Sequence, residues 1–144
     1  MNDKSILLVE DNPDDEEFTL RALNRGKVGN NVVIARDGSE ALDYLLGTGK
    51  YEGRDLSVMP AVVLLDLKLP KVGGLEVLQR MRAEEATRFV PVVVLTSSSE
   101  EEDKLRSYQF GANSYVRKPV EFGEFATAVS QLGVYWMLLN ELPH

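Results

Sequence analysis

The segment Val62-Val63-Leu64-Leu65-Asp66 constrains the fold of this chain more than any other. Its four consecutive apolar residues end on a carboxylate, and Pro70 follows four positions later. An uninterrupted Val/Leu run predicts a strand that is buried on both faces, as in the centre of a parallel sheet. Asp66 would then lie where the strand leaves the sheet, and open α/β sheets bind their ligands at this end. Taken alone, the segment is equally compatible with an Asp66 that merely begins a turn.

Four other short apolar runs alternate with amphipathic segments along the chain. They cover residues 5–9, 32–35, 91–95 and 114–117, and a helical pattern follows each of them. This alternation predicts an α/β fold, in which a five-stranded parallel sheet carries helices on both faces. Right-handed crossovers leave few topologies, and we predict the flavodoxin-like, doubly wound strand order 2-1-3-4-5. We expect residues 1–144 to form one domain without an output domain, and a last helix from about Glu121 nearly to the C-terminus.

Composition excludes several classes of function. The net charge is −7 and no basic stripe occurs, which argues against nucleic-acid binding. No apolar run approaches the roughly 18 residues that span a bilayer, and no secretion signal is recognisable, so we expect a cytoplasmic protein without a membrane partner. Cysteine is absent and the only histidine is His144. Carboxylates, hydroxyls, lysine and a metal ion are therefore left to carry any reaction.

Residues 47–60 form the longest irregular stretch and contain fragments of two nucleotide-binding motifs. A phosphate loop around Gly49-Lys50 would need Gly at position 44 and Ser or Thr at position 51, but both positions are Tyr. The dinucleotide-binding motif needs a third glycine and a preceding strand, and this stretch has neither. We therefore predict a surface loop.

Polar side chains follow four of the five predicted strands. The first strand ends on Glu10-Asp11, the third on Asp66, the fourth on Thr96 and the fifth on Lys118. The predicted strand order brings these groups to one point at the sheet edge. Carboxylates so close together repel one another unless a cation joins them. Magnesium accepts such ligands, and we predict Asp11 and Asp66 as direct ligands and Glu10 as a ligand through water.

A carboxylate neutralised by a metal ion is also an oxygen nucleophile. Phosphoryl transfer to it requires mainly positioning and stabilisation of charge on the phosphoryl oxygens. We expect magnesium to take one of these oxygens and the ammonium of Lys118 a second. The Thr96 hydroxyl or nearby backbone amides would take the third.

Glu10-Asp11, Asp66, Thr96 and Lys118-Pro119 together resemble the receiver domain of two-component response regulators, over essentially the whole chain. The resemblance implies that a sensor histidine kinase phosphorylates Asp66 and that the acid pair helps to hold magnesium. It also implies three further assignments, which are a backbone carbonyl of Lys68 on the metal, a switch pair of Thr96 and Tyr115, and a cis peptide bond before Pro119.

A narrower resemblance concerns the loop 47–60 and the segments 111–120 and 132–136. These are similar to single-domain regulators that pair with bacterial phytochrome-type histidine kinases.

Residues 134–139 are apolar all the way round, whereas a surface helix keeps a polar face. This end either folds onto its own domain or forms a homodimer. We predict the homodimer, which the resemblance also implies, with contacts from Val134, Tyr135, Trp136 and Leu138.

We therefore predict a phosphoacceptor switch that is not an enzyme in its own right. Two alternatives remain. An aspartyl-phosphate hydrolase of small phosphoesters commonly has a second acid two residues after the nucleophile, where this chain has Lys68. An interaction module with the receiver fold would never take phosphate, and the intact set of acids, hydroxyl and lysine argues against it.

Overall fold

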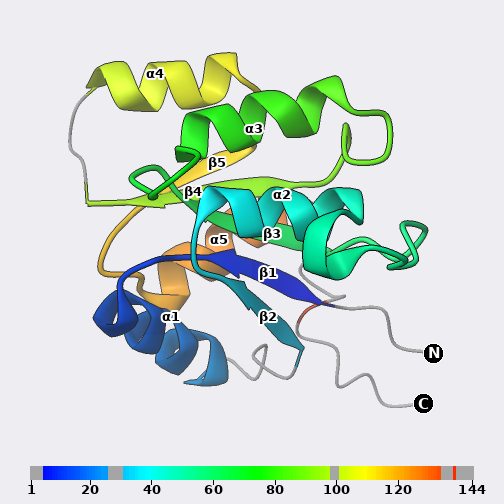
Figure 1. Ribbon diagram of the computed structural model, residues 1–144. Helices are drawn as coiled ribbons and strands as arrows, with labels where there is room; N and C mark the ends of the chain where they lie inside the picture. Colours follow the sequence, from blue (N-terminus) through cyan, green and yellow to red (C-terminus); the bar gives the residue numbers. More distant parts are fainter. Residues whose placement is uncertain (1–4, 26–30, 98–100, 134–137, 139–144) are drawn as a thin grey trace.

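Five parallel strands form one sheet in the order β2-β1-β3-β4-β5 in the computed structural model, which describes residues 5–25, 31–97, 101–133 and 138 (Figure 1). The predicted topology is therefore confirmed. The strands are β1 (Ile6–Val9), β2 (Val32–Ala35), β3 (Val62–Asp66), β4 (Val92–Thr96) and β5 (Ser114–Arg117). The helices are α1 (Pro13–Arg25), α2 (Gly38–Leu46), α3 (Gly74–Ala83), α4 (Glu101–Gln109) and α5 (Phe122–Gln131), with a short 3-10 helix η1 (Gly49–Tyr51) after α2.

Successive residues of the central strands enter two separate hydrophobic cores. In β1, Ile6 and Leu8 face one core, and Leu7 and Val9 face the other. Helices α1 and α5 cover the first core, while α2, α3 and α4 lie on the opposite face of the sheet (Figure 1). Since both faces of these strands are buried, the period-2 alternation of side chains produces uninterrupted apolar runs in the sequence.

We expected one helix from about Glu121 nearly to the C-terminus. The structure interrupts this helix, because α5 ends at Gln131, whereas Leu138, the one described residue beyond Gly133, is again helical. Gly133 follows α5 with φ 77°, the left-handed conformation in which glycine commonly ends a helix. Within the described residues, no helix has the length and apolar character that crossing a membrane requires.

The long loop between α2 and β3 is held by Arg54. The guanidinium donates hydrogen bonds to the carbonyl oxygens of Tyr44, Leu45 and Val58 and lies 4.1 Å from the Tyr44 ring centroid. These bonds satisfy backbone groups at the end of α2 and within the loop. The prediction of a surface loop is confirmed, and the 3-10 helix η1 is its only helical segment among the described residues.

Gly74 lets α3 begin directly against the end of β3. A Cβ atom at this position would lie 2.2 Å from the carbonyl oxygen of Asp66 and 2.7 Å from Cα of Leu67. The N–H of Gly74 also donates a hydrogen bond to the carbonyl oxygen of Leu67, at 3.0 Å. Because backbone atoms surround the missing Cβ, any side chain here would displace the loop that carries Asp66.

We expect Gly74→Ala to lower the free energy of unfolding by about 1–3 kcal/mol, the usual cost of an overpacked site. Gly123→Ala in α5 is the matched control, because no atom lies within 4 Å of its Cβ position. The control should gain up to about 1 kcal/mol from the better helix propensity of alanine. Urea unfolding of both variants measures the difference, and equal responses would contradict the packing argument.

Candidate functional site

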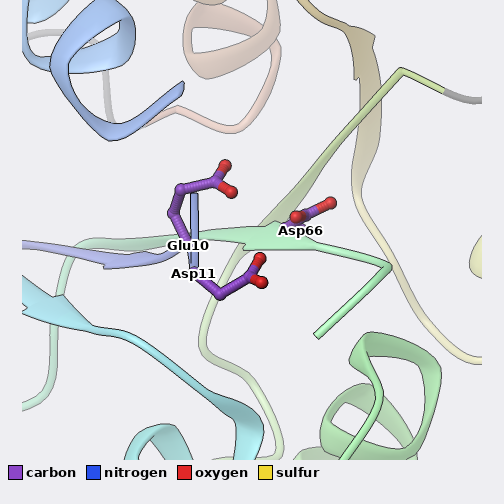
Figure 2. A group of neighbouring side chains, drawn as sticks. All are labelled: Glu10, Asp11 and Asp66. Carbon is purple, nitrogen blue, oxygen red and sulfur yellow. The ribbon is translucent and has the colours of Figure 1, made fainter. Parts of the chain in front are cut away.

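Three carboxylates converge at the carboxyl ends of β1 and β3 (Figure 2). The two strands pair in parallel with Val9 opposite Leu65, so the residues that follow them come side by side. Glu10, Asp11 and Asp66 each offer an oxygen, and these oxygens lie within 4.8 Å of one another. Glu10 and Asp66 are buried, whereas Asp11 is exposed.

The ammonium group of Lys118 enters this cluster from the loop after β5. Its Nζ lies 2.7 Å from Oε1 of Glu10, 2.9 Å from Oδ2 of Asp15 and 3.3 Å from Oδ2 of Asp66. The Lys118 side chain is only 9% exposed, so the charge is largely removed from water. An ammonium buried to this degree needs opposite charges around it, and the acids provide them.

Burial raises the pKa of Glu10 to about 7, and the negative charge of Asp66 acts in the same direction. The contact with Lys118 and a hydrogen bond from the N–H of Asn12 oppose this rise only in part. For Lys118, burial is the largest single effect and acts against the charged form, but the contacts with Glu10, Asp15 and Asp66 together outweigh it and raise the pKa. The ammonium therefore stays charged, while the acids retain an excess of negative charge.

The Asp66 carboxylate is oriented from two directions. Its Oδ1 accepts a hydrogen bond from the N–H of Lys68 at 3.3 Å, and its Oδ2 faces Lys118. The first contact forms because the chain turns back over the carboxylate directly after β3. The backbone of Lys68 thus lies beside Asp66, while the role of its carbonyl group as a metal ligand remains a prediction.

Thr96 and Tyr115 lie on the two strands beyond β3. Thr96 is the last residue of β4, is buried, and accepts a hydrogen bond from the N–H of Lys118 at its carbonyl oxygen, at 2.9 Å. Tyr115 lies opposite Val94 on β5 and packs, partly buried, against the core under α2 and α3. The peptide bond between Lys118 and Pro119 is cis, as predicted.

Asp15 contacts Lys118, but its sequence context indicated only an acidic first turn of a helix.

Of the expected dimer contacts, Val134, Tyr135 and Trp136 lie outside the described residues. Leu138 is 8% exposed and belongs to the core under α1 and α5, which is where folding back onto the domain would place it.

The donor set fits a hard divalent cation. Oε1 of Glu10 is buried and has no hydrogen bond within the described part of the chain, so its only close partner there is the ion pair with Lys118. Burial is the main cause of the raised pKa of Glu10 and the charge of Asp66 adds to it, so a cation beside these acids would favour their charged forms. Carboxylate oxygens are the ligands that Mg²⁺ and similar ions prefer.

Residues 6–130 match the family model of the response regulator receiver domain, so the chain belongs to this family. It is similar to a solved bacteriophytochrome response regulator, AtBRR, with 59% identity, a TM-score of 0.85, and coverage of 96% of this chain and 98% of that chain. A second, RtBRR, has 55% identity, a TM-score of 0.86, and coverage of 99% and 85%. Response regulator Rcp1 from Synechocystis sp. is 35% identical over 140 residues, which are 97% of this chain and 93% of Rcp1. Both levels of the resemblance seen in the sequence are confirmed.

We expect the metal-free protein to become less stable as the pH rises from about 4.5 to about 7. The pKa of Glu10 rises from its ordinary 4.5 to about 7 on folding, so in this window the folded state binds more protons than the unfolded state. Relative to Glu10→Gln, the wild type should lose roughly 2–3 kcal/mol, since one pKa unit corresponds to about 1.4 kcal/mol. Urea unfolding in EDTA at several pH values measures this, and parallel profiles would contradict it.

Proposed function

We propose that this response regulator accepts a phosphoryl group on Asp66 from the phosphohistidine of a sensor histidine kinase, in the cytoplasm. The observation that carries the proposal is the position of the Asp66 carboxylate, which lies close to both the ammonium of Lys118 and the acid pair at the end of β1. A similar protein, the cyanobacterial phytochrome response regulator RcpA, has been solved in a phosphorylated form, with 36% identity and a TM-score of 0.76.

In the proposed reaction, a carboxylate oxygen of Asp66 attacks the phosphorus atom. The phosphorus–nitrogen bond to the donor histidine breaks, and its electron pair stays with the imidazole ring, which takes up a proton. The product is an acyl phosphate on Asp66, and its hydrolysis resets the protein. Lys118 is placed to neutralise one phosphoryl oxygen, since its Nζ already lies 3.3 Å from Oδ2 of Asp66.

Mg²⁺ is the cofactor that we propose for this pocket. Asp11, Asp66 and the backbone carbonyl of Lys68 would hold it directly, and Glu10 would hold it through water. When bound, the ion supplies positive charge that offsets repulsion among the carboxylates and the incoming phosphoryl group. A structure of the Mn²⁺-bound form of Rcp1 supports a divalent ion in a protein with this fold.

The switch that we propose begins at Thr96. A phosphoryl group adds roughly two negative charges next to Asp66, and the Thr96 hydroxyl at the end of the neighbouring strand would move toward them. Tyr115, which is partly buried one strand further on, would then turn inward and alter the surface of α4, β5 and α5. The similarity to bacteriophytochrome response regulators supports a phytochrome-type kinase as the donor.

Incubation with acetyl phosphate and magnesium chloride tests the proposed phosphorylation. We expect intact-mass measurement to show the gain of one phosphoryl group in the wild type and in Asp14→Asn, an exposed acid of the neighbouring helix. Asp66→Asn should show no gain, because the nucleophilic oxygen is removed. Chelation of magnesium should also prevent the gain.

The same experiment separates the two alternative functions. Steady release of phosphate from small phosphoesters, without a stable modified form, would favour an aspartyl-phosphate hydrolase. Failure of the wild type to gain mass from acetyl phosphate and from a phosphorylated kinase would favour an interaction module with the receiver fold.

We also propose a homodimer, on the basis of the apolar C-terminal segment. Sedimentation equilibrium at micromolar concentration should give a dimer, and beryllofluoride with magnesium should shift the monomer–dimer equilibrium because it mimics the phosphoryl group. A monomer in both conditions would contradict the proposal and leave the buried position of Leu138 as the better guide to how this segment packs.

A further inference from the structure

Asp15 contacts Lys118 from outside the cluster of three carboxylates. Its Oδ2 lies 2.9 Å from Nζ of Lys118, and its side chain is 41% exposed. Glu10 and Asp66, in contrast, approach the same ammonium from buried positions. Asp15 therefore lies at the rim of the pocket and belongs to α1 rather than to the sheet edge.

The position of Asp15 is fixed by residues that also build the pocket. The N–H of Asn12 donates to Oε2 of Glu10 at 3.2 Å. The side-chain oxygen of Asn12 accepts the N–H of Asp15 at 3.1 Å, as the N-cap of α1. Lys118 in turn contacts both Asp15 and Glu10. The four residues Glu10, Asn12, Asp15 and Lys118 therefore form a closed ring of contacts at the first turn of α1. This ring keeps Asp15 facing the ammonium.

Asp15 and Asp66 compete for one ammonium group. The distance from Nζ to Asp66 is 3.3 Å, which is longer than the distances to Glu10 and Asp15, at 2.7 and 2.9 Å. A charge–charge interaction weakens with distance, so Lys118 interacts least closely with the carboxylate that would be phosphorylated. The contact with Asp15 holds the ammonium on the α1 side of the pocket.

We propose that Asp15 is a positioning residue that restrains Lys118 and thereby slows phosphoryl capture by Asp66. This inference rests on the proposed function. A phosphoryl group on Asp66 adds roughly two negative charges that attract the ammonium. Lys118 must weaken its contact with Asp15 to meet them, and the more exposed carboxylate of Asp15 returns to water at little cost.

Asp15→Asn removes the restraint, and Asp14→Asn is its matched control. Both variants remove one acid from the first turn of α1, but Asp14 is exposed and has no ion pair within the described residues. We expect Asp15→Asn to increase the rate of phosphorylation by acetyl phosphate by about two- to fivefold, the upper part of the range for an exposed ion pair. The affinity for beryllofluoride with magnesium should rise by a similar factor. Asp14→Asn should change either quantity less than twofold.

Two further variants show whether Asp15 acts through Lys118. Asp15→Glu keeps the charge and should restore slow phosphorylation. In a Lys118→Met background, Asp15→Asn should have no effect on beryllofluoride affinity, because the ammonium group that Asp15 restrains is absent. Magnesium affinity, measured by calorimetry without phosphoryl donor, should be the same in Asp15→Asn and Asp14→Asn, since Asp15 is outside the cluster of possible ligands.

The outcomes distinguish this inference from the proposed function. If the wild type gains no phosphoryl group in the mass measurement, the proposed function fails and the inference fails with it. If the wild type is phosphorylated but Asp15→Asn reacts no faster than Asp14→Asn, the inference alone is overturned. The inference would also be overturned if Asp15→Asn raised the beryllofluoride affinity equally in the wild-type and Lys118→Met backgrounds. The effect of Asp15 would then not pass through the ammonium.

Discussion

The buried ion pair between Lys118 and Glu10 is the contact on which the pocket depends. The fold forces the acids together, because β1 and β3 are parallel neighbours and end at the same edge. Burial and mutual repulsion both oppose ionisation of Glu10, and the ammonium at 2.7 Å is the nearby charge that partly offsets them. The ammonium of Lys118 faces several clustered carboxylates, and a bound cation would offset the repulsion that remains among them.

The features that depend on strand order could be predicted from the sequence. Once the strands are arranged as 2-1-3-4-5, Asp66 must lie next to the residues that follow Val9, whatever the details of packing. The sequence determines helix faces less firmly. In α3, Leu75, Leu78 and Met81 recur at helical spacing, yet Val77 is buried with Leu78 and Met81 while Leu75 is only partly buried. A helix has several neighbouring apolar positions, and the direction of its axis decides which of them face the sheet.

The contact between Asp15 and Lys118 could not be predicted in this way. The two residues are 103 positions apart, and an acid in the first turn of a helix is already explained by the helix dipole. Their contact depends on the direction in which α1 leaves the sheet, and hence on the hydrogen bonds of Asn12. Asparagine is a common helix N-cap, but capping fixes only where a helix begins. It does not determine which charged group the first turn will face.

The two acids at the end of β1 lie in different surroundings. Successive residues of an extended chain point in opposite directions, and the side chains of Glu10 and Asp11 diverge accordingly (Figure 2). Glu10 is buried and faces Lys118, whereas Asp11 is exposed to the solvent from which a hydrated ion would arrive. A divalent ion on the Asp11 side would therefore add its charge where the ammonium does not reach. Asp66 would then have positive charge on both sides, which is the arrangement that an incoming phosphoryl group with three oxygens requires.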